Sequence, residues 1–316
     1  MFSLNDFLLG GAIPLAAALI AFAVAWGAAR RAGMAWSTGV VLGFAAGVMA
    51  LATRGVSFNA ALSLVKPHES HEWLPLLSLV AAAPALVGAA LGRFRGWRWI
   101  VSLAIVAAAP VWLLWGGKYL PDEQLRDSGF ATSAWGYGEA ALIVGSLAVA
   151  ALAAWILWEA AAPDESPRVR SLLAEIAIVA MAATSAMTGS ITYAQVFGCL
   201  AAAVGGAAVA GWVFQMKSGP EAAAGPVLIV AGGALVLAVL YSSMRPIQAA
   251  GLWLAMALAA GRLPGLARVK PVASMAIRCA VCLIPIGLVL WQAGADFAEM
   301  QRKQQEAAES NPYLNL

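Results

Sequence analysis

The stretch AALIVGSLAVAALAAWILW, at residues 140–158, carries no charged side chain. A helix rises about 1.5 Å per residue, so about 20 residues cross a hydrocarbon core of roughly 30 Å. The stretch does not alternate between apolar and polar residues, as the strands of a membrane-spanning barrel do. Because lipid offers the backbone no hydrogen-bonding partner, a spanning segment must form its hydrogen bonds within itself. These residues therefore predict a transmembrane α-helix.

Similar apolar stretches recur along the chain, and the composition leads to the same conclusion. Of 316 residues, 62% are hydrophobic and 11% are charged, and the net charge is +3. An average soluble domain has about 25% charged residues, so this chain has too few charges to cover a water-facing surface. The sequence predicts an all-α, polytopic transmembrane helical bundle of about ten spanning helices, at 9–29, 35–52, 73–91, 99–116, 137–158, 171–188, 191–214, 225–243, 247–261 and 271–292.

A charged loop bounded by prolines, at residues 159–170, divides these stretches into five and five. We expect one transmembrane domain at 1–293, with candidate halves at 1–160 and 168–293, and a polar C-terminal tail at 294–316. An odd number of helices in each half would place the two halves in inverted orientation, as in many secondary transporters.

The distribution of basic residues predicts how the chain is oriented. Lysine and arginine gather in the loops after the first, third, fifth, seventh and ninth predicted helices, and loops rich in these residues stay in the cytoplasm. Most of the 13 tryptophans fall near the ends of predicted helices, where their rings favour the membrane interface. We therefore predict a multi-pass protein of a bacterial inner membrane with both termini outside. No basic patch indicates nucleic-acid binding.

Two of the predicted helices carry small residues at every fourth position. In lipid, helices associate through close backbone contact, which small residues allow. This spacing predicts static tight packing, and the alternative is a substrate path or a sliding contact along the same faces. The first face is formed by Gly39, Gly43 and Gly47, and the second by Gly198, Ala202, Gly206 and Ala210.

Two charged side chains lie well inside predicted spans, beyond the first turn. Arg278 lies about seven residues into the last helix, and Glu175 lies about four residues into the sixth. A charge at such a depth costs about 2.5–3.5 kcal/mol on insertion scales unless it is paired or hydrated. We expect the two to form an ion pair. Arg278 would then bind an anionic group or take part in a proton-linked switch, or it would serve as a structural ion pair or reach the inner interface.

Polar residues are also concentrated near the predicted outer surface. If they face one another, they form a polar cavity that admits a substrate from outside, with Gln195, Tyr193, Arg245 and Glu139 as binding residues. The alternative is ordinary interfacial polarity, with hydroxyls bonded back to their own helices. The full set comprises Glu139, Thr184, Ser185, Thr188, Ser190, Thr192, Tyr193, Gln195, Tyr241, Ser242, Ser243, Arg245 and Gln248.

The sequence HESHE, at residues 68–72, is the one candidate metal site. Histidine and glutamate bind divalent metals, but His68 and His71 do not have the four-residue spacing of the zincin helix. The alternative is a solvated loop that caps a helix. Cys279 and Cys282 lie in an apolar stretch and are expected to act as small hydrophobic side chains. We predict no cofactor.

These features support three hypotheses about function. The first is a secondary transporter or permease for a small solute, with Arg278 as the buried charge. The second is a non-catalytic membrane subunit or scaffold that binds a protein partner through the tail at 294–316. The third is a membrane-embedded enzyme, against which the small number of histidines and acidic groups argues. We therefore expect a protein that is not an enzyme.

Overall fold

The computed structural model describes residues 8–53, 69–91, 95–115, 118–121, 127–128, 135–160, 166–216, 220–261, 263 and 270–309. Every element in these residues is helical. The ten α-helices each overlap one helix predicted from the sequence, and they are α2 (Ile13–Ala29), α3 (Ala32–Thr53), α5 (Trp73–Leu91), α6 (Arg95–Leu114), α8 (Tyr137–Glu159), α9 (Pro167–Met187), α10 (Ile191–Val213), α11 (Ala224–Tyr241), α12 (Pro246–Ala260) and α13 (Pro271–Glu309). Short helical segments η1 (Leu8–Ala12), η2 (Ser70–Glu72) and η3 (Pro220–Ala223) precede α2, α5 and α11.

Within the described residues, seven helical segments are long and apolar enough to cross a membrane, which is compatible with a multi-pass integral membrane protein. The predicted number of ten spans is not confirmed. For example, α12 has 15 residues, which gives about 22 Å of helix, less than a hydrocarbon core of roughly 30 Å. The seven segments are Leu8–Ala29, Ala32–Thr53, Tyr137–Glu159, Pro167–Met187, Ile191–Val213, Glu221–Tyr241 and Val272–Glu306.

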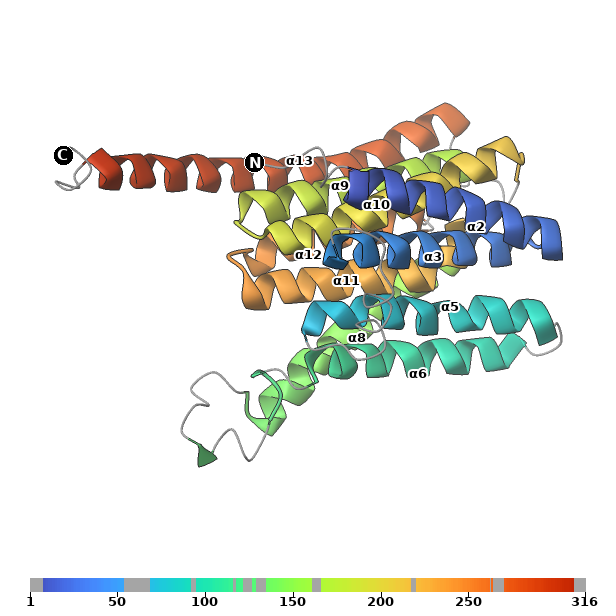
Figure 1. Cartoon of the computed structure of the whole chain (residues 1–316), viewed down its shortest axis with the longest axis horizontal. Helices are drawn as coiled ribbons and strands as arrows, with labels where there is room; N and C mark the ends of the chain where they lie inside the picture. The colour runs from blue at the N-terminus through green and yellow to red at the C-terminus, as the bar shows by residue number, and fades with distance from the viewer. Residues whose placement is uncertain are drawn as a thin grey trace.

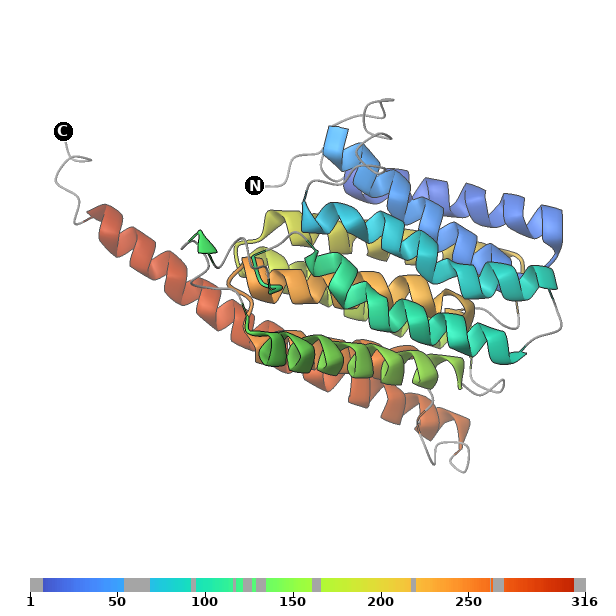
Figure 2. The same cartoon turned by 90° about the horizontal axis from the view of Figure 1, so that it is seen from below.

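The helices run side by side, with α10 and α11 inside the bundle and α8 and α13 at its flank (Figures 1 and 2). Helix α10 contacts α2, α3, α9 and α11. In α10, 72% of the apolar span is buried inside the protein, against 17% in α8. The outward face of α8, with Leu142 and Val149, is therefore apolar and exposed, as a lipid-facing surface would be.

Helix α13 is longer than predicted and extends beyond the rest of the bundle (Figures 1 and 2). It continues from the predicted span through much of the predicted polar tail, and ends at Glu309. Where it leaves the bundle, the Asp296 carboxylate accepts a hydrogen bond of 2.8 Å from Arg245 at the start of α12. Farther along, the ion pairs Arg302–Glu306 and Lys303–Glu299 join successive turns, which supports a helix in water.

The small-residue faces of α3 and α10 both lie against α2. A Cβ atom added at Gly43 would lie 2.6 Å from the Cβ of Ala18, and one added at Gly206 would lie 2.6 Å from the carbonyl oxygen of Leu15. Real Cβ contacts are not this short, so these positions admit only glycine without a shift of the backbone. The predicted tight packing is therefore confirmed at Gly43 and Gly206, with α2 as the partner, whereas a Cβ atom added at Gly198 would meet nothing within 4 Å.

Replacing Gly43 by valine should lower the free energy of unfolding by about 1–3 kcal/mol, because the added side chain overpacks the contact with α2. The measurement is thermal or chemical unfolding of the purified protein in detergent. The matched control is Gly145→Val on α8, where an added Cβ would meet nothing within 4 Å. Equal unfolding of the two variants would contradict the close contact.

Candidate functional site

The Arg278 guanidinium binds the C-terminal end of α12. Its side chain is buried, and Nη1 donates hydrogen bonds to the carbonyl oxygens of Gly261 at 2.8 Å and Ala259 at 3.3 Å. The last carbonyls of a helix have no partner within the helix and carry a partial negative charge, so a cation stabilises them. Arg278 is thus placed as a cap that joins α13 to the end of α12.

The predicted ion pair between Glu175 and Arg278 is absent from the described residues. The Glu175 carboxylate lies instead against α10: a Cβ atom added at Gly205 would be 2.6 Å from Glu175 Oε1. The sequence predicts similar membrane depths for the two charges, but Glu175 contacts α10 and Arg278 contacts α12. Glycine at position 205 is what leaves space for the carboxylate.

Ion pairs hold the first turns of α9 and α12. Arg170, buried in the first turn of α9, donates a hydrogen bond of 3.1 Å to Glu221 in η3. Arg245 contacts Asp296, as described above, and the buried Gln248 amide also reaches that carboxylate at 3.4 Å. The predicted binding residue Arg245 therefore holds the start of α12 to α13.

The predicted outer polar residues do not form one cavity in the described part of the chain. Thr188 and Ser242 donate hydrogen bonds to carbonyl oxygens of their own helices, which is the alternative expected above. Tyr193 is buried in α10, and its backbone N–H donates to the Ser190 hydroxyl that caps this helix. Glu139 lies exposed in the first turn of α8, where the helix dipole favours an anion.

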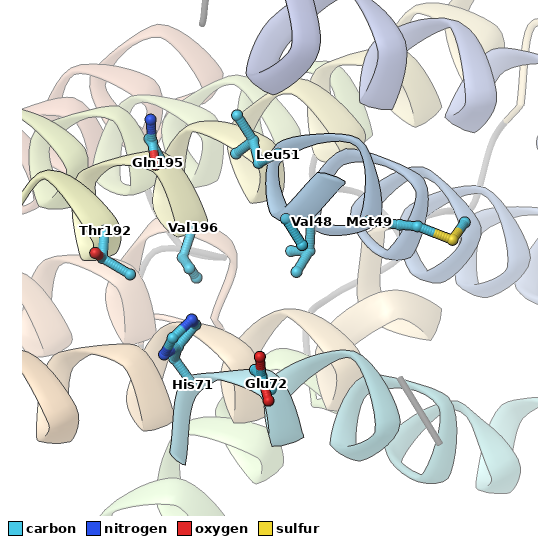
Figure 3. A pocket seen from close by; sticks show the side chains of 9 residues that line it. Val48, Met49, Leu51, His71, Glu72, Thr192, Gln195 and Val196 are labelled. Atoms are coloured by element: carbon cyan, nitrogen blue, oxygen red, sulfur yellow. The ribbon is translucent and has the colours of Figure 1, made fainter. Parts of the chain in front are cut away.

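Gln195 does line a small pocket of mixed polar and apolar lining, of about 130 Å³, between α3, η2 and α10 (Figure 3). Its polar groups also include Thr192 from α10 and His71 and Glu72 from η2. The structure thus brings a residue of the predicted binding set next to the predicted metal loop. Pockets for drug-sized ligands have about 300–1,000 Å³, so this one has room only for waters or a small ion.

Of the predicted metal loop, His71 and Glu72 line this pocket. His68 lies outside the described residues, and His71 Nδ1 lies 3.2 Å from Glu69 Oε2 of the same turn. Glu69 and Glu72 form a capping box at η2, since the Glu72 side chain accepts from the Glu69 backbone N–H. Among the described residues, no group of three or more His, Cys, Asp or Glu side chains could hold a metal ion.

A much larger cavity, of about 630 Å³, lies between α6, α8, α11 and α12. Its walls are almost entirely apolar, and the Ser146 hydroxyl, one of the few polar groups, donates to the Ile143 carbonyl oxygen of its own helix. At Gly232 and Gly233 the α11 wall carries no side chain, and Trp253 of α12 lies beside Gly232. Size and lining are those of a site for a molecule with a large apolar part.

No family model, curated protein or solved structure matches this chain. Only the geometry therefore bears on function.

The large cavity was not predicted from the sequence. The adjacent glycines at 232 and 233 were a signal, because they remove side chains from one level of an otherwise bulky helix. They do not fall into the four-residue spacing that identified α3 and α10.

Replacing Arg278 by glutamine should lower the free energy of unfolding by about 1.5–3 kcal/mol, the typical contribution of hydrogen bonds to a charged group. Thermal unfolding in detergent would measure it. The control is Arg302→Gln on the exposed part of α13, which should change stability by less than about 0.5 kcal/mol. If Arg278→Gln is as stable as the unchanged protein, Arg278 does not act as a structural cap.

Proposed function

We propose that this chain is a multi-pass membrane protein of the permease type, whose solute has a large apolar part held in the cavity between α6, α8, α11 and α12. The cavity carries this proposal, since of the two pockets described above it is the one with room for an organic molecule. A permease needs a solute site among its helices, and five helices contribute to this one, since Leu77 of α5 also lines it.

The same geometry supports an apolar solute over the small anionic solute expected from Arg278. The Arg278 guanidinium is occupied by the carbonyl oxygens at the end of α12 and is buried there. The guanidinium nitrogen that donates these hydrogen bonds, Nη1, is therefore engaged by α12 rather than by a solute. The pocket at Gln195 has several polar groups, but its volume of about 130 Å³ excludes most organic solutes.

Replacing Ala150 by phenylalanine should block the cavity, because Ala150 of α8 lines it and a phenyl ring would occupy its space. We expect labelling of α11 and α12 by a neutral, photoactivated alkyl diazirine in proteoliposomes to fall about tenfold, or about 1.4 kcal/mol in binding. Peptide mass spectrometry measures the sites of labelling.

The matched control is Val149→Phe, one residue away, because Val149 is 67% exposed on the outward face of α8. A second cavity variant, Ala249→Phe on α12, guards against misfolding of the first. If labelling of the cavity walls is the same in Ala150→Phe and Val149→Phe, the cavity is not a binding site and the proposal fails.

The proposal places both termini outside, in a bacterial inner membrane, on the strength of the basic loops. A cysteine introduced at Ala298, on the part of α13 beyond Asp296, should then react with a membrane-impermeant maleimide added to intact cells. The three native cysteines, at positions 199, 279 and 282, lie within apolar helices and provide the unreactive background. Reaction only after the cells are broken would place the C-terminal end inside.

A further inference from the structure

Three aromatic rings, here called the aromatic cover, lie together at one end of the large cavity, and one of them, Trp135, lines it. The ring of Tyr119 lies 5.3 Å from that of Trp135 and 5.3 Å from that of Tyr241. The Tyr119 hydroxyl donates a hydrogen bond to the Leu240 carbonyl oxygen, and the Trp135 backbone N–H donates to the Tyr119 carbonyl oxygen at 3.0 Å. Trp135 and Leu240 both line the cavity, so these contacts fix the segment around Tyr119 at its end.

Lys118 lies at this end of the cavity. Its ammonium nitrogen is 5.3 Å from the centre of the Tyr119 ring, and its side chain is exposed. No carboxylate of the described residues lies within ion-pairing distance of it. Arg245, which precedes the cavity-lining Pro246, differs from Lys118 because it forms an ion pair of 2.8 Å with Asp296.

An exposed carboxylate is found at the same end. Ile143, Ser146 and Ala150 of α8 line the cavity, and Glu139 lies four residues before Ile143 on the same face of the helix. Glu139 is also four residues after Trp135, which belongs to the aromatic cover. Glu139 and Lys118 form no ion pair with each other in the described structure. Lys118 therefore lies beside the aromatic cover, and Glu139 lies one helical turn before the cavity lining of α8. Neither forms an ion pair within the described residues.

This arrangement complements a particular class of amphiphile. Tyrosine and tryptophan prefer the headgroup level of a bilayer, so the aromatic cover belongs at that level and the cavity at the level of the acyl chains. A lysine binds phosphate as a point charge, and a carboxylate binds an ammonium group.

We propose that the cavity binds an acyl chain of a zwitterionic phospholipid, with its phosphate at Lys118 and its ammonium group at Glu139. This inference rests on the proposed function and specifies its solute. An anionic lipid would meet the Glu139 carboxylate with no group to pair with it, and a lipid without phosphate would leave Lys118 without a partner. Both should therefore bind less tightly than the zwitterionic one.

The test is native mass spectrometry of the full-length protein in detergent, with three lipids of identical acyl chains. They are phosphatidylethanolamine, phosphatidylglycerol and diacylglycerol, added in equal amounts. We expect the protein to bind phosphatidylethanolamine about fivefold more than phosphatidylglycerol, since one charge near a membrane surface contributes about that much. Diacylglycerol should bind least.

Two charge variants test the two contacts separately. Glu139→Gln should abolish the preference for phosphatidylethanolamine over phosphatidylglycerol, while binding of phosphatidylglycerol is kept. Lys118→Gln should lower binding of both phospholipids relative to diacylglycerol by about fivefold. The matched control is Lys270→Gln, which removes an exposed lysine just before α13, distant in sequence from the cavity lining, and should change neither ratio.

The results also separate this inference from the proposed function. If Glu139→Gln and Lys118→Gln keep the lipid preferences of the unchanged protein, or if phosphatidylglycerol binds best, the assignment of the headgroup is wrong. If none of the three lipids binds while the neutral diazirine still labels the cavity, the solute is apolar but not a phospholipid. If Ala150→Phe leaves diacylglycerol and diazirine binding unchanged, the cavity site itself is wrong.

Discussion

The close contact of α2 with α3 and α10 is the interaction on which the rest of the bundle depends. In lipid, the hydrophobic effect does not bring helices together, because the acyl chains are as apolar as the side chains. Association then requires the backbones to approach closely, and Gly43 and Gly206 allow this on either side of Ala18. The contact places α10 in the interior, where it meets α9 and α11 and so positions the helices that surround the large cavity.

Charged side chains fix several helix ends, whereas the Glu175 carboxylate lies well inside α9, against Gly205 of α10. Arg278 binds the last carbonyls of α12, Arg245 joins its first turn to Asp296, and Arg170 joins α9 to Glu221. Each of these three arginines binds at or near a helix end, where backbone groups also need partners. A charge in mid-membrane would cost several kcal/mol without such partners. Away from the helix ends a charged group would lack such partners, and the large cavity is accordingly lined almost entirely by apolar side chains.

The two cavities differ in volume and in lining. The pocket at Gln195 combines groups that the sequence had marked as interesting, but its volume is about 130 Å³. The cavity of about 630 Å³ contains none of the marked residues. Its chemistry becomes specific only at the end, where Lys118 and Glu139 border it beside the aromatic cover. Glu139 had been expected in a binding site for a different reason, as part of a polar outer cluster.

The sequence alone determined the ten helices and the glycine face of α3, because hydrophobicity and residue spacing are local properties. A segment such as 140–158 must be helical in lipid whatever surrounds it, since its backbone can bond only to itself. Only the tertiary structure decided that Arg278 meets the end of α12 and Glu175 meets α10, because these partners are distant in sequence. The position of the large cavity also depends on the tertiary structure, because an apolar helix face can contact lipid, another helix or an open space. Val149 and Ala150 are adjacent apolar residues that the sequence does not distinguish, yet Val149 faces outward and Ala150 lines the cavity.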